Sequence, residues 1–144
     1  MLEILVVVSI ITLMSVLVYA PFNDFRAQKT LDASVEKILS AFSQAHLDTI
    51  SSKDNQQYGV HIASGEVVYY VGPTYATGTA TNLVFVLHPA IEIYNISLNG
   101  GGSDVLYQRL TGATNQNGTF QLRPKGRTDT VATITINKTG ATSI

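Results

Sequence analysis

An uncharged, mostly apolar run from Ile4 to Ala20 limits the folds open to this chain more than any other feature of its 144 residues. Its 17 residues would form a helix of roughly 26 Å at about 1.5 Å per residue, close to the roughly 30 Å hydrocarbon thickness of a bilayer. Glu3 precedes the run, at the place where a secretory signal would carry Lys or Arg. The run therefore predicts a membrane-spanning helix, and the alternative is a hydrophobic core helix of a soluble protein.

The residues after Pro21 continue this helix as an amphipathic one. No Gly or second Pro interrupts residues 22–50, and apolar residues recur at spacings of three and four, at Leu31, Val35, Ile38, Phe42 and Ala45. A Pro inside a helix removes one backbone hydrogen bond and tends to kink it, so we expect a bend at Pro21. We predict one helix over about residues 2–50, ended by the polar stretch Ser51–Asn55.

The hydrophobic period changes to two after Gln57. Tyr58–Ala63 and Glu66–Val71 predict a β-hairpin joined at Ser64 and Gly65. Leu83–Leu87 is an unbroken apolar run, which suits a strand covered on both faces. We therefore expect it in the centre of the sheet, under the amphipathic helix.

Four further strands complete the prediction. Their apolar alternation places them at Ile91–Leu98, Val105–Leu110, Thr119–Arg123 and Val131–Asn137. The alternation slips in the first of these, which predicts a bulge near Tyr94 and Asn95. The fold class is α+β: one long N-terminal helix packed on a C-terminal antiparallel β-domain, divided into residues 1–21, 22–50 and 51–144.

Composition and motifs give no sign of an enzyme. The net charge is −1 and there is no Cys, which excludes a disulfide framework, a thiol nucleophile and a Cys-ligated zinc site. His46, expected near the seam between helix and sheet, His61 and His88 lack metal-ligand spacing, and hydrolase, zincin and phosphate-loop motifs are missing. We predict no enzyme, cofactor or metal; a calcium site from Asp104 and Asp129 is the alternative to two solvated turns.

The N-terminal pattern resembles a known family. Leu2-Glu3, the run Ile4–Ala20, Pro21 and the amphipathic continuation are similar to the N-terminal helix of type IV pilins and type II secretion pseudopilins. In that family prepilin peptidase removes a basic leader ending in Gly, and the new N-terminus, usually Phe, is methylated. A Glu follows that N-terminus by four residues, so matching Glu3 to it implies a mature start two residues before Met1. Leader, Gly and Phe are not in this sequence, and Pro21 lies about one place later than is common. The strands from Leu106 onward are similar to the β-domain of GspH/FimT-type minor pseudopilins.

This resemblance implies a structural subunit of a type IV pilus or of a type II secretion pseudopilus. Such a subunit is anchored in the cytoplasmic membrane by one span with its head outside the cytoplasm, and then joins a periplasmic or extracellular helical filament. Its partners would be other subunits, contacted through the helix, with membrane lipid, prepilin peptidase and the inner-membrane assembly machinery. Glu3 would contact a neighbouring subunit's N-terminal amine. The alternative function is a membrane-tethered extracytoplasmic binding domain.

Two smaller features complete the candidate site. Arg123, Lys125 and Arg127 form the densest positive cluster, and the Gly-Arg pair at residues 126–127 is similar to an element of FimT-like minor pilins of DNA-uptake systems. The cluster predicts either contact with DNA or another polyanion, or a solvated turn. Hydroxyl groups of Ser9, Thr12 and Ser15 share a helix face, and would bond either across helices or to their own backbone carbonyls.

Overall fold

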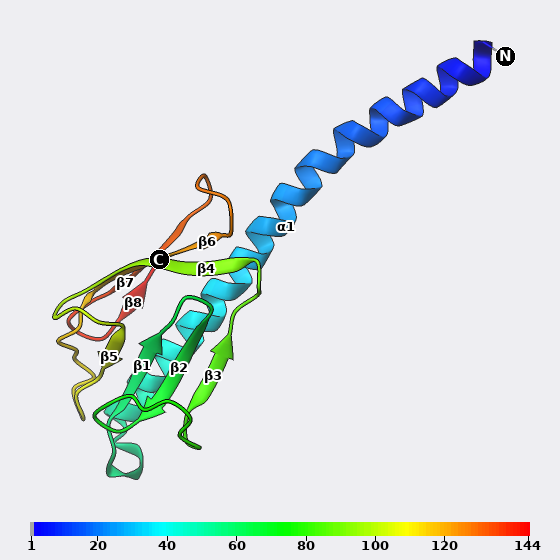
Figure 1. Ribbon diagram of the computed structural model, residues 1–144. Coiled ribbons are helices and arrows are strands. Elements are labelled where there is room, and N and C mark those ends of the chain that lie inside the picture. Colours follow the sequence, from blue (N-terminus) through cyan, green and yellow to red (C-terminus); the bar gives the residue numbers. More distant parts are fainter. Residues whose placement is uncertain (1) are drawn as a thin grey trace.

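A single helix, α1, runs from Leu2 to Ile50 and is followed by the β-domain (Figure 1). The computed structural model describes residues 2–144, with the side chains of residues 2–15 and 25–144. The first half of α1 projects away from the strands, whereas its second half lies against them. The predicted helix of about residues 2–50 is thus confirmed, and a short 3-10 turn, η1 (Lys53–Asn55), follows it.

Pro21 does not end the helix, since α1 is continuous through it. Its side chain lies outside the described ones, and the bend expected there stays a prediction. No helix in the described part of the chain is both long and apolar enough to cross a membrane. The membrane-spanning helix expected over residues 4–20 is therefore not confirmed, and residues 16–20 of it lie outside the described side chains.

The β-domain consists of two four-stranded sheets with antiparallel pairing throughout. The first has the order β3-β2-β1-β5, and the second β4-β6-β7-β8. The strands are β1 (Tyr58–Ile62), β2 (Glu66–Val71), β3 (Leu83–Val86), β4 (Ile91–Leu98), β5 (Asp104–Leu106), β6 (Gly118–Pro124), β7 (Ala132–Ile136) and β8 (Thr142–Ser143). A long helix packed on an antiparallel β-domain confirms the predicted α+β class.

One face of the second half of α1 supplies the helical side of the core. All five residues of the predicted stripe are buried: Leu31, Val35, Ile38, Phe42 and Ala45. The ring of Phe42 stacks on that of Phe120 in β6 with 5.8 Å between centroids, and both side chains are fully buried. Burial of this apolar stripe fixes which way the helix faces the head.

The predicted hairpin is confirmed. Strands β1 and β2 pair in the register Tyr58↔Val71 to Ile62↔Val67, with the turn at Ser64 and Gly65. Gly59 lies opposite Tyr70, and a Cβ at residue 59 would collide with the Tyr70 ring. The missing side chain at Gly59 therefore lets the tyrosine ring lie across β1.

The position predicted for the Leu83–Leu87 strand is wrong. Strand β3 lies at the edge of the first sheet, beyond β2, and is not central (Figure 1). Leu83, Val84 and Val86 are 47%, 53% and 58% exposed, so the strand is not covered on both faces. An apolar run shows that a strand can be covered, but nothing local in the sequence decides which strand pairs beside it.

Two irregularities follow from local backbone geometry. The pairing of β4 with β6 shifts register between Tyr94 and Ser97, and Asn95 has φ 52°, which confirms the predicted bulge. The strand predicted at Val105–Leu110 is shorter than expected, because β5 ends at Leu106 and Leu110 has φ 67°. A left-handed residue cannot continue an extended strand.

Candidate functional site

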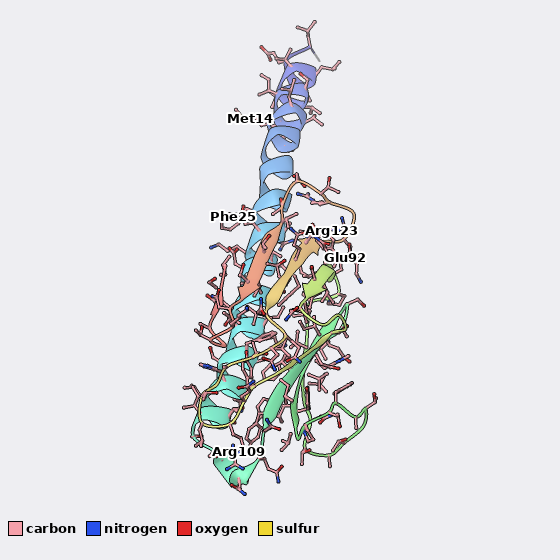
Figure 2. All side chains as sticks on the ribbon, turned by 90° about the vertical axis from the view of Figure 1, so that its left-hand side faces the viewer. Met14, Phe25, Glu92, Arg109 and Arg123 are labelled. Carbon is pink, nitrogen blue, oxygen red and sulfur yellow. The ribbon has the colours of Figure 1, made fainter. Side chains whose placement is uncertain are left out.

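Exposed apolar side chains are concentrated on the described part of the projecting half of α1 (Figure 2). Large apolar side chains are exposed along the described part of this half, at Leu2, Ile4, Leu5, Val6, Val7, Val8, Ile10, Ile11, Leu13 and Met14. Because soluble monomers rarely expose contiguous apolar patches this large, the surface indicates a binding region. We call residues 2–14 of α1 the projecting apolar segment.

Glu3 lies in the first turn of this segment, and its side chain is exposed. A carboxylate in the first turn of a helix interacts favourably with the helix dipole. In an apolar environment the same carboxylate would be costly without a cationic partner. Burial of the segment in an apolar environment would therefore be favourable only with a positive group near Glu3.

The hydroxyl groups on the projecting half of α1 bond to the helix itself. Ser9 Oγ donates to the Val6 carbonyl and Ser15 Oγ to the Ile11 carbonyl, both at 2.8 Å, and Thr12 Oγ1 donates to the Val8 carbonyl. This confirms the predicted alternative in which the hydroxyl groups bond to their own backbone carbonyls. Since these donors are satisfied, the face that carries them can enter an apolar contact at little cost.

The three expected cations of the polyanion site differ in their surroundings. Arg123 lies beside Glu92 (Figure 2), and its Nε donates to Glu92 Oε1 at 2.7 Å. Its guanidinium lies 4.1 Å from the centre of the Tyr94 ring. Lys125 is exposed on the loop between β6 and β7, and Arg127, on the same loop, is half-buried and has an interaction of its own. The geometry therefore ties Arg123 to β4, apart from the loop cations.

The histidines lie in three separate places. His46 lies at the seam between α1 and the head, 5.3 Å from Tyr107 between ring centroids, but its Nε2 is buried with no hydrogen-bond partner. His61 Nδ1 lies 2.6 Å from Asp104 Oδ1, and its ring stacks on Tyr75 with centroids 4.0 Å apart. His88 is exposed beyond the end of β3. No described cluster of three or more His, Asp or Glu could hold a metal ion.

Four tyrosines are held in their neutral form by the head. Burial raises the pKa of Tyr70 to about 12, and the negative charge of Asp104 adds to this shift. Burial also raises the pKa of Tyr58, of Tyr69, whose hydroxyl donates to Asp48 at 2.8 Å, and of Tyr107. All four side chains are buried in the head.

A groove of about 500 Å³ runs between α1 and the end of β3, and sequence reasoning missed it. Its helix side includes Lys29, Ala33 and Lys37, and its other side is formed by residues 86–88. Lys37 Nζ donates to the Val86 carbonyl at 2.6 Å across it. The two lysines lie eight residues apart on one stripe of the helix, and this spacing is visible in the sequence. Which strand edge lies opposite them depends on the fold and is not.

This architecture is pilin-like: a long helix whose second half packs on an antiparallel head and whose first half projects. Two crystal structures of the type IV minor pilin FimU from Pseudomonas aeruginosa share it. The P21 form has a TM-score of 0.62 at 13% identity, covering 83% of this chain and 91% of FimU. The P65 form has a TM-score of 0.59 at 13% identity, covering 78% and 90%. No family model and no curated protein matches the sequence.

The predicted family resemblance is thus matched by the fold. The two matching crystal structures are those of a minor pilin and not of an enzyme. At 13% identity they establish the architecture of this chain.

Proposed function

We propose that this chain is a structural subunit, not an enzyme, which joins a filament of pilin-like subunits through the projecting apolar segment. The observation that carries this proposal is the exposure of that segment beside a head whose core is already complete without it. A helix needed only for the fold would end where the head ends. The likeness of the fold to a minor pilin supports the same role.

The exposed area is large enough to drive assembly. Ten large apolar side chains are exposed between Leu2 and Met14. Full burial of one such side chain contributes about 1.5–3 kcal/mol, so burying half of the ten against sister helices would contribute on the order of 7–15 kcal/mol. Costs of association reduce this figure, but it is of the size that a stable contact requires.

Glu3 would set the register of this contact. A lone carboxylate at the centre of an apolar layer costs about 2.5–3.5 kcal/mol, and a positive partner offsets that cost. We propose that the partner is the N-terminal amine of a neighbouring subunit, which with an ordinary pKa near 7.7–8.0 is mostly protonated at pH 7. Packing of helices that places Glu3 elsewhere would leave the charge unpaired.

The proposal includes a membrane stage. Before assembly, the run Ile4–Ala20, which includes most of the projecting apolar segment, would be inserted in the cytoplasmic membrane with the head on the extracytoplasmic side. Prepilin peptidase and the inner-membrane assembly machinery would act there, and the filament, pilus or pseudopilus, would form outside the membrane. Fractionation of cells tests this stage, because a chain that stays in the soluble fraction throughout would contradict it.

The test of assembly compares substitutions within the projecting apolar segment. Glu3→Ala should reduce filaments counted by electron microscopy about tenfold or more, since the pairing charge is lost. Ile10→Asp should do the same by placing a new charge in the contact. Lys53→Gln, on the exposed turn η1, is the control and should leave filaments unchanged. Undiminished assembly by Glu3→Ala and Ile10→Asp would overturn the proposal.

The alternative of a tethered binding domain is less well supported. A tether requires a flexible linker between anchor and head. Here α1 is continuous from Leu2 to Ile50 and is packed in the head by its own apolar stripe. We propose no separate DNA site, because Arg123, one of its three expected cations, is held by Glu92 and Tyr94.

A further inference from the structure

Strand β3 is apolar on both faces but has a neighbour on one side only. Leu83, Val84 and Val86 are each about half exposed, and β2 is the strand that pairs with β3 in its sheet. Continuous apolar runs are typical of strands that are covered on both faces, as in the interior of a sheet. Exposed edges usually carry charges or Pro, which block pairing with other chains. The composition of β3 is therefore that of an interior strand.

The free edge of β3 presents backbone groups of Val84 and Val86. The Leu87 N–H donates to the Gly65 carbonyl, toward β2. Since backbone groups alternate in direction along a strand, those of Val84 and Val86 point away from β2. The Val86 carbonyl confirms this direction, because it accepts the hydrogen bond from Lys37 Nζ at 2.6 Å. A lysine thus covers part of the edge.

The groove beside this edge is positively charged. It contains Lys29 and Lys37 on the helix side and His88 on the strand side, and no acidic residue is among the residues that line it. His88 Nδ1 accepts the Ala90 N–H at 3.1 Å, which leaves Nε2 as the N–H donor of the neutral ring. The groove can therefore donate hydrogen bonds and attract carboxylates.

We propose that β3 binds an extended, acidic segment of a partner protein as an additional strand. Backbone hydrogen bonds to Val84 and Val86 would hold the segment, and its apolar side chains would cover the exposed valines. Its carboxylates would pair with Lys29 and Lys37, and Lys37 would exchange the Val86 carbonyl for a carboxylate. This binding does not depend on assembly through the projecting apolar segment.

The spacing of the lysines defines the sequence of the segment. Lys29 and Lys37 are eight positions apart on α1, which is roughly 12 Å along the helix axis. An extended strand covers that distance in about four residues at roughly 3.3 Å each. Residues four apart in a strand project to the same face, so two acidic residues at positions one and five of the segment would both face the lysines. Apolar residues at positions two and four project to the opposite face and would lie against the valines.

The experiment uses a fluorescent hexapeptide, acetyl-Glu-Val-Thr-Val-Glu-Val-amide, and the full chain in detergent micelles. Fluorescence anisotropy measures its affinity. The matched peptide with Lys in place of both Glu should bind at least tenfold more weakly. Equal binding of the two peptides would overturn the acidic assignment, and absence of binding by the Glu peptide would overturn the proposal.

Variants of the edge locate the binding. Val84→Pro removes the N–H that points away from β2 and leaves the bonds to β2 in place. It should weaken the Glu peptide at least tenfold, whereas Val84→Ala should keep most of the affinity. Lys37→Gln should weaken it several-fold, and the exposed Lys53→Gln should not. Unchanged binding by Val84→Pro would contradict strand addition.

A second reagent covers the case in which Val84→Pro disturbs the fold. The Glu peptide with N-methyl groups on alternate residues keeps its charges and side chains but loses the N–H donors of one edge. Two such peptides, methylated on either set of residues, present opposite edges. Strand addition predicts that one of the two loses at least tenfold in affinity for the unaltered chain. Equal affinity of both would contradict it.

Discussion

Gly140 packs directly against His46, so that a Cβ at residue 140 would lie 2.7 Å from His46 Cδ2. The same Cβ would also collide with the Gly112 carbonyl oxygen, and a Cβ at Gly112 would lie 2.8 Å from Ile50 Cδ1. Two turns of the head therefore close on the last turns of α1 with no room for a side chain. This contact joins the C-terminal strands to the helix at the end opposite to the projecting apolar segment.

Replacing Gly140 by Ala should lower the free energy of unfolding by about 2–4 kcal/mol, from left-handed backbone strain and from the displaced backbone. Gly140 has φ 86°. The control is Gly126→Ala, because Gly126 has φ 77° but open space around it, and should cost only about 1–2 kcal/mol. Urea unfolding followed by circular dichroism measures both. Equal losses would show that the contact with His46 and Gly112 adds nothing.

Removal of the Phe120 ring should be among the most damaging single truncations in the core. Phe120 is fully buried and stacks on Phe42, so Phe120→Ala should cost about 3–5 kcal/mol. Phe25 in α1 is 61% exposed, and Phe25→Ala should change the free energy of unfolding by less than about 0.5 kcal/mol. Thermal unfolding of the two variants under one set of conditions tests this contrast. A similar cost at both positions would contradict the assignment of the core.

The long helix, the hairpin and the bulge could be predicted because each depends on neighbours in the sequence. The stripe from Leu31 to Ala45 has the helical period, and the slip of phase near Asn95 marks the register shift that the structure contains. The edge position of β3 could not be predicted, because its exposure depends on which strands lie beside it. An apolar run is the same in the sequence whether the covering strand belongs to this chain or to another.

The candidate site was predictable in the same uneven way. Glu3 and the apolar run are visible in the sequence, and the structure adds that residues 2–14 project from the head. The pairing of Arg123 with Glu92 was not predictable, because it joins residues 31 apart through the register of β4 with β6. The groove beside Lys37 was missed for the same reason, since it exists only where β3 meets α1.

The stability of the head should fall at alkaline pH. Burial raises the pKa of Tyr70 to about 12, whereas tyrosine in an unfolded chain has a pKa near 10. Between these values the folded chain keeps a proton that the unfolded chain releases, so rising pH favours unfolding. This contribution is fully present below pH 10 and is lost as the pH rises toward 12. The raised pKa values of Tyr58, Tyr69 and Tyr107 act in the same direction.

Tyr70→Phe isolates one part of this effect. The variant has no phenolic proton at residue 70, so its urea midpoint should fall less steeply between pH 9 and pH 11.5 than that of the unaltered chain. Phenylalanine keeps the aromatic ring that lies over Gly59, so the two midpoints should be close at pH 7. Parallel curves over the whole alkaline range would contradict a role of Tyr70.

Asn95 should tolerate Gly but not a β-branched residue. It has φ 52° at the bulge of β4, its side chain is exposed, and its Nδ2 donates to Gln121 Oε1 at 3.1 Å. Val at this φ is a steric outlier, so Asn95→Val should cost about 1–2 kcal/mol. Gly adopts the conformation freely, and Asn95→Gly should stay within about 0.5 kcal/mol, since loss of one exposed hydrogen bond is the main change.

Ser97→Val provides the matched control for the bulge. Ser97 lies on the same strand at the other side of the register shift, is exposed, and is not among the residues of positive φ. Valine is favourable in an extended strand, so this variant should unfold within about 0.5 kcal/mol of the unaltered chain. Urea unfolding of Asn95→Val, Asn95→Gly and Ser97→Val under the same conditions separates backbone strain from side-chain chemistry. An equal loss of stability for Val at both positions would mean that the left-handed conformation of Asn95 does not cause the effect.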